Sequence, residues 1–85
     1  MTDQIEITIK RCRIRSWRRG MKEMDLILGP FADALSPMIV QTQLELFVDL
    51  LEENDQDLYS WFFVKEEAPE RYSPILAEIR SFHNI

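Results

Sequence analysis

The sequence predicts an all-α fold, a compact five-helix antiparallel bundle, on three observations. Apolar residues recur at spacings of three and four along most of the chain, which is the period of an amphipathic helix. The 85 residues include only two glycines and four prolines, so many tight turns are not expected. Residues 5–9 alternate like a strand, but no second segment offers a partner strand. The length favours a single domain over residues 1–85.

The first half of the chain predicts two helices. We expect the first over residues 4–18, ended by Gly20 at a C′ position with positive φ. An apolar stripe then marks the second helix: Met21, Met24, Leu28, Phe31 and Leu35. Gly29-Pro30 lies inside this stripe, where proline removes a backbone donor, so we expect a kink or a break. Trp17 is expected to anchor in the core.

The second half predicts three more helices. Ser36-Pro37 and Ser73-Pro74 have the pattern of helix starts, with serine as N-cap and proline at the first helical position. Asp55 is expected to cap the short helix between them. Residues 65–69 are polar and contain a proline, which predicts a loop. The expected apolar stripes are Val40, Leu44, Phe47 and Leu51, then Leu58, Trp61 and Phe62, then Ile75, Leu76, Ile79 and Phe82.

Single cysteine and histidine residues limit the chemistry that the chain can perform. Cys12 has no second cysteine with which to form an internal disulfide. Cys12 and His83 do not make a metal site without several carboxylates. A catalytic triad needs a base held beside a nucleophile, and His83 is poorly placed for this two residues from the end. We therefore expect no metal ion and no catalytic residues.

Charge is unevenly distributed along the chain. Residues 1–20 carry six basic and two acidic side chains, whereas the rest carries four basic and thirteen acidic ones. Such a basic end on an acidic body can steer the molecule towards a complementary partner. The basic residues and Trp17 leave open a helical adaptor that binds RNA or another protein. The pI near 4.8 disfavours nucleic acid, and we expect none.

Targeting and membrane signals are weak. No apolar run approaches the roughly 20 residues of a transmembrane helix, and the N-terminus has no apolar signal-peptide core. Asp3 and Glu6 disfavour a mitochondrial transit peptide. No sustained heptad pattern indicates a coiled-coil dimer. We expect a cytoplasmic monomer that does not contact membranes.

One segment concentrates charge at an expected helix–helix junction. It is Arg18-Arg19-Gly20-Met21-Lys22-Glu23-Met24-Asp25. A structural explanation needs only an exposed Arg19–Glu23 ion pair, which contributes roughly 1 kcal/mol or less, and a helix-ending Gly20. The functional alternative is a binding surface. From the residues alone, the structural explanation is favoured.

The run from Arg19 to Asp25 resembles the Arg-Gly-x-x-Glu signature of the SdhE family, the succinate dehydrogenase assembly factors. The resemblance continues through residues 26–31 and a second block at 47–52 and 55–61, covering about residues 13–62 in the family's order. The family often has Asp-Pro-Asp-Leu where this chain has Asp55-Gln56-Asp57-Leu58. Proline favours a helix start, so this difference weakens a cap rather than a binding site.

The resemblance implies a five-helix chaperone rather than an enzyme. Such a protein binds the flavoprotein subunit of succinate dehydrogenase, and in bacteria also that of fumarate reductase. It promotes covalent attachment of FAD to a histidine of that subunit. FAD would be the partner's cofactor and would not be stably bound by this chain, which needs no nucleophile of its own. Whether fumarate reductase is a client of this chain stays open.

The resemblance also implies a partner-binding surface at the signature. We expect Arg19 to offer its planar fork to a carboxylate or carbonyl of the partner, and Gly20 to allow close backbone approach. Glu23 would accept from a partner donor or hold Arg19 in position. Asp25 would brace the same surface. The remaining expected partner-binding residues, which would add electrostatic steering, are Arg15 and Arg18.

Overall fold

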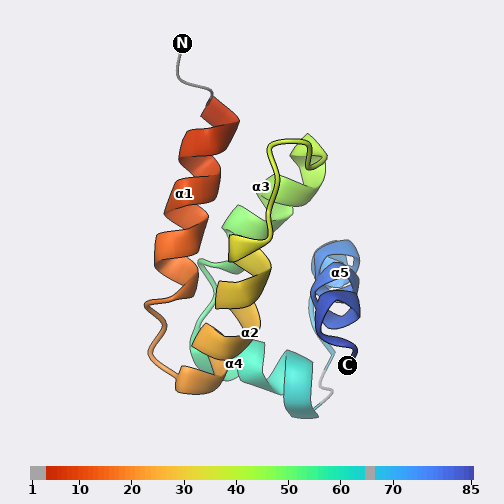
Figure 1. Ribbon diagram of the computed structural model, residues 1–85. Helices are drawn as coiled ribbons and strands as arrows, with labels where there is room; N and C mark the ends of the chain where they lie inside the picture. Colours follow the sequence, from red (N-terminus) through yellow and green to blue (C-terminus); the bar gives the residue numbers. More distant parts are fainter. Residues whose placement is uncertain (1–3, 65–66) are drawn as a thin grey trace.

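Helices account for all regular structure in the computed structural model, which describes residues 4–64 and 67–85 (Figure 1). No strand occurs among those residues, so the all-α prediction is confirmed. The elements are α1 (Gln4–Ser16), α2 (Lys22–Asp33), α3 (Gln41–Leu50), α4 (Asp55–Tyr59), the π-helix η1 (Ser60–Val64), the 3₁₀-helix η2 (Glu70–Tyr72) and α5 (Ser73–His83).

Helix α2 is central in the packing. It contacts α1, α4 and α5, while α3 contacts α1 and α5. Helices α1 and α2 run in opposite directions and are joined by a short loop; α4 runs across the end of α2 near that loop (Figure 1). None of the described helices has both the length and the apolar character needed to cross a bilayer. Because α4 lies beside it, the α1–α2 loop is at the point where α1, α2 and α4 meet.

Most of the predicted apolar stripes form the core. The largest fully buried side chains are Tyr72, Phe47, Met24, Leu28, Leu44, Leu50, Leu58, Ile75 and Ile79. Phe31 and Phe47 meet edge to face with ring centroids 5.2 Å apart, which joins α2 to α3. Two predicted core residues are wrong, because Val40 is 63% exposed and Phe82 is 46% exposed.

The first predicted helix is confirmed, but its predicted end is wrong. α1 stops at Ser16, and no glycine in the described part of the chain has positive φ, so Gly20 is not a left-handed cap. Of the predicted kink or break at Pro30, the break is wrong, because α2 continues to Asp33. Burial of the residues after Pro30, including Phe31 and Ala32, accounts for this continuity, since packing of an apolar face outweighs local propensity.

Three predicted helix starts are corrected by the structure. Ser36 accepts from the Met38 N–H in a turn, and α3 begins only at Gln41. Asn54, not Asp55, caps α4 by accepting from the Asp57 N–H at 2.8 Å. Helix α5 begins one residue earlier than expected: Ser73 is its first residue, Tyr72 is its N-cap, and no side chain caps it. The helix continues directly from η2.

The polar segment 65–69 falls partly outside the described residues. Its positions 65 and 66 are not described, and positions 67–69 have no regular structure. The π-helix η1 was not predicted; it buries Trp61 and Phe62. Arg80 of α5 donates to the Trp61 carbonyl, and the His83 ring nitrogen lies 2.7 Å from the Ile27 carbonyl oxygen. These contacts tie α5 to η1 and α2.

Candidate functional site

Arg19, in the α1–α2 loop, is bound within the protein. Its side chain is only 9% exposed, and its Nε donates to Asp55 Oδ1 at 2.7 Å. Nη1 donates to the Leu51 carbonyl and Nη2 to the Glu53 carbonyl, each at 2.7 Å. Carbonyls at a helix C-terminus lack intrahelical donors and favour a nearby cation. Arg19 thus caps the end of α3 while it pairs with the start of α4.

Asp55 organises the loop from the opposite side. Its Oδ2 accepts from the backbone N–H groups of Gly20 at 2.5 Å and Met21 at 3.1 Å. Asp25 accepts from the Arg19 N–H at 2.7 Å. Carboxylates of α4 and α2 therefore satisfy three successive backbone donors of the loop. We define the Arg19 lock as this network of Arg19, Asp55, Asp25 and the Gly20 and Met21 amides.

The lock corrects the expected role of Arg19. Its guanidinium has little surface left for a partner, because the side chain is 9% exposed and each of its three nitrogens donates within the chain. Gly20 has a structural requirement of its own, since an added Cβ would lie 3.1 Å from Asp55 Oδ2. The sequence did not single out Asp55 for this site. The available signal was its position in the second block of family resemblance.

The lock leaves other signature residues at the surface. Arg18, Gly20, Lys22 and Glu23 are exposed. The side chains of Arg18 and Glu23 make no hydrogen bond or ion pair within residues 4–64 and 67–85, and the expected Arg19–Glu23 pair is absent there. The exposed surface of the signature is therefore formed by Arg18, Gly20, Lys22 and Glu23, while Arg19 and Asp25 are less exposed.

Arg15 is also paired within the chain. Its Nη1 donates to Glu52 Oε1, in an ion pair whose side chains are 43% and 64% exposed. The hydrogen bond and charge of Arg15 lower the pKa of Glu52, and the same hydrogen bond raises the pKa of Arg15. Because the pair is solvent-exposed, it contributes little to stability, and Arg15 keeps surface to offer for electrostatic steering.

Trp17 lies flat against α2 rather than in the core. It is 43% exposed, and its indole N–H donates to Asp33 Oδ2 at 3.1 Å. A Cβ built on Gly29 would lie 2.4 Å from the Trp17 ring. Gly29 therefore provides the space in which the indole rests on the helix, a role indicated in the sequence only by a glycine inside an apolar stripe.

Cys12 lies on α1, and its side chain is buried in the core. Burial raises the pKa of its thiol to about 11 from an ordinary value of 9.0, against a smaller lowering effect of Arg15. In the described part of the chain, no three or more His, Cys, Asp or Glu side chains gather in a way that could hold a metal ion. Because its thiol is buried and has a raised pKa, Cys12 is a packed and unreactive side chain.

The Cys12 thiol is expected to resist alkylation in the folded protein. At pH 8 it is protonated in the fold, so iodoacetamide should label it slowly until urea unfolds the chain; mass spectrometry follows the label. Because the folded pKa lies above the unfolded one, the thiol's contribution to stability is complete below pH 9.0 and falls as pH rises towards about 11. Cys12→Ala should remove that part of the pH dependence. Equal labelling rates with and without urea would contradict the assignment.

The comparisons with known proteins agree with the signature. A family model described as "Flavinator of succinate dehydrogenase" matches residues 10–83. The chain belongs to this family. The flavinator model thus spans the Arg19 lock and reaches into the end of α5. No solved structure gives a significant match to the chain.

Several curated relatives carry corresponding names. The chain is 43% identical over 51 residues to an FAD assembly factor SdhE of Pseudomonas putida, covering 60% of this chain and 61% of the relative. It is 38% identical over 64 residues to an SdhE of Legionella pneumophila, covering 75% and 81%. The mitochondrial succinate dehydrogenase assembly factor 2 of Dictyostelium discoideum is 32% identical over 80 residues, with 94% and 57% covered.

The chain thus spans about three fifths of the length of the Pseudomonas and Dictyostelium relatives. All three names refer to assembly of succinate dehydrogenase or its FAD. None of them supports the RNA-binding adaptor that the basic N-terminal segment left open.

Proposed function

We propose that this protein is an assembly factor that binds the flavoprotein subunit of succinate dehydrogenase and promotes covalent attachment of FAD to a histidine of that subunit. The observation that carries the proposal is the flavinator family match over residues 10–83. Names of relatives from two bacteria and a mitochondrial system support it. The protein acts as a non-catalytic helper, and FAD remains the partner's cofactor.

The geometry supports two roles within the signature, contact with the partner and support of the loop backbone. Arg18, Gly20 and Glu23 form the contact surface, and the Arg19 lock holds the backbone beneath it in one shape. A preorganised loop loses little conformational freedom on binding, which favours affinity. By stabilising one conformation of the flavoprotein, the factor would hold the flavin and the acceptor histidine close together. Arg15 adds steering from the neighbouring surface.

Three further properties belong to the proposal. The protein works in the cytoplasm, is monomeric when free and keeps no stably bound cofactor. The flavoprotein subunit of fumarate reductase, which the family resemblance implied for bacteria, is the candidate for a second client. The same flavinylation assay, run with each flavoprotein in turn, tests the client range, and sedimentation tests the monomer.

Glu23→Gln is expected to impair flavinylation without changing stability. Glu23 is exposed and unpaired within the described residues, so its carboxylate can accept a hydrogen bond from a donor on the partner. A hydrogen bond to a charged group contributes about 1.5 to 3 kcal/mol, so covalent flavin should form about tenfold more slowly at limiting factor. In-gel flavin fluorescence of the large subunit, in a strain lacking the native gene, measures this.

The matched control is Glu78→Gln, an exposed glutamate of α5. It should restore flavinylation as the unchanged protein does. If Glu23→Gln restores it equally well, Glu23 is not part of the contact surface. If the unchanged protein adds no covalent flavin, the proposed function itself is wrong.

A further inference from the structure

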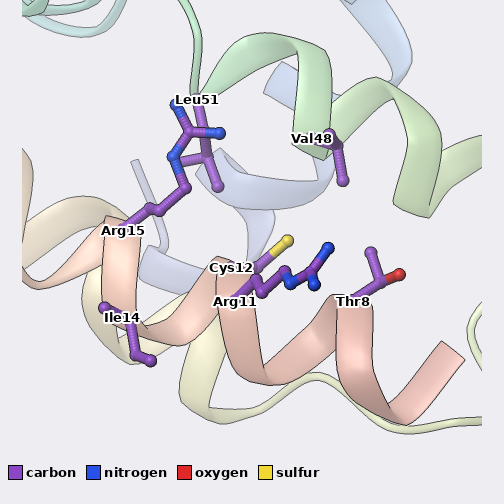
Figure 2. A pocket seen from close by; sticks show the side chains of 7 residues that line it. All are labelled: Thr8, Arg11, Cys12, Ile14, Arg15, Val48 and Leu51. Carbon is purple, nitrogen blue, oxygen red and sulfur yellow. The ribbon is translucent and has the colours of Figure 1, made fainter. Parts of the chain in front are cut away.

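A groove of about 300 Å³ lies between α1 and the end of α3, apart from the exposed signature residues. From α1, Cys12 points towards α3, where Val48 and Leu51 face it (Figure 2). These three side chains make an apolar floor. Arg11 and Arg15 extend over the same space from α1 (Figure 2). The groove therefore combines an apolar floor with two cations.

The two arginines differ in what they offer to a ligand. Arg15 is paired with Glu52. Arg11 is exposed and makes no hydrogen bond or ion pair with any residue in 4–64 or 67–85. A free guanidinium beside an apolar hollow fits a carboxylate attached to an apolar group. The apolar floor and the Arg11 guanidinium together fit a ligand that is acidic and partly apolar.

We infer that this groove binds an acidic segment of the flavoprotein client, with one apolar side chain in the hollow and a carboxylate on Arg11. The inference rests on the proposed function and adds a second contact surface to the signature. Helix α1 carries four basic side chains and one acidic side chain, which makes it complementary to an acidic partner. An apolar anchor in a pocket with a polar rim is typical of protein interfaces.

Nucleic acid fits this surface poorly. Glu52 lies against Arg15 at the groove, and Asp49 and Glu45 line an adjoining hollow with Thr8 and Val48. A continuous row of phosphates would meet these carboxylates and be repelled. A protein segment can place its acidic residue on Arg11 alone. The groove is therefore assigned to a protein partner.

Binding of the purified flavoprotein subunit, isolated before FAD attachment, tests the inference. Arg11→Glu reverses the free charge, and its control Lys10→Glu makes the same change at an exposed α1 position that does not line the groove. Thr8→Phe places a ring in the groove; among the described residues, the Thr8 hydroxyl donates to the Gln4 carbonyl of its own helix alone. Its control is Thr42→Phe, exposed on α3 and outside the groove.

Arg11→Glu and Thr8→Phe are each expected to raise the Kd about thirtyfold, the size of effect typical of an interface hot spot. Arg11→Glu should also weaken the dependence of binding on salt. Both controls should bind within about twofold of the unchanged protein, since a rim charge away from the contact contributes little. Thermal melting verifies that all four variants are folded.

Several outcomes would overturn the inference. If Arg11→Glu and Thr8→Phe bind like their controls while Glu23→Gln binds weakly, the proposed function stands and the groove assignment fails. If the unchanged protein forms a dimer that Thr8→Phe abolishes, the groove is an interface between copies instead. If RNA competes with the flavoprotein for Arg11, the occupant is wrong. If the flavoprotein does not bind at all, the proposed function and the inference fail together.

Discussion

Asp55→Ala is expected to lower the free energy of unfolding by about 3 kcal/mol, because removing one partner of a buried ion pair leaves the other charge uncompensated. The Asp55 and Arg19 side chains are 15% and 9% exposed. The substitution also removes the acceptor for the Gly20 and Met21 amides. For a domain of this size, the loss corresponds to a fall in Tm of roughly 12 to 24 °C.

Urea unfolding and thermal melting measure this loss. The control is Glu52→Ala, which breaks an ion pair whose side chains are 43% and 64% exposed, and which should leave stability unchanged within error. A double-mutant cycle with Arg19→Ala then isolates the coupling between Asp55 and Arg19. Equal stabilities for Asp55→Ala and Glu52→Ala would show that the Arg19 lock does not support the fold.

Gly29→Val is expected to lower the free energy of unfolding by about 2 kcal/mol, as for other overpacked sites. Even a single added carbon at Gly29 would lie 2.4 Å from the Trp17 ring, well inside contact distance. The indole must move off α2 and give up its hydrogen bond to Asp33. Valine is a slightly better helix former than glycine, but this small gain does not offset the displaced ring.

NMR of the two indole N–H groups distinguishes this mechanism from general unfolding. The Trp17 resonance should shift, while that of Trp61, which is 7% exposed in the core, should stay in place. Ala77→Val is the control, because it introduces the same side chain at an exposed position of α5. A Trp17 resonance that is unchanged in Gly29→Val would refute the packing explanation.

Periodic burial explains which parts of the fold could be predicted from the sequence. Leu44 and Phe47 lie a turn apart on one helix face and are both buried, and spacing alone identifies such a face. Helix ends were predicted less well. Ser36-Pro37 has a good local start signal, yet α3 begins at Gln41, after a turn in which Ser36 accepts from the Met38 N–H. A cap contributes only about 1 kcal/mol, too little to fix a helix start by itself.

The signature drew attention to the α1–α2 loop, but the internal contacts of Arg19 could not be predicted from the sequence. Arg19 meets Asp55 across 36 positions of the chain, a contact that no local pattern reports. The same holds for the close approach of Trp17 to Gly29. Burial of a charged side chain depends on which distant segments meet it, whereas the exposed Glu23 could be recognised by sequence alone.

The Arg19 lock implies that the proposed contact surface depends on the folded conformation, although its residues come from one segment of the chain. The proposed contact residues lie within one short segment of the chain, but the backbone donors beneath them are held by Asp55 of α4 and by Asp25. A synthetic peptide with the sequence of residues 18–25 would lack Asp55 and the Leu51 and Glu53 carbonyls to which Arg19 donates. The peptide would therefore contain the signature sequence without the contacts that hold its backbone in the folded conformation.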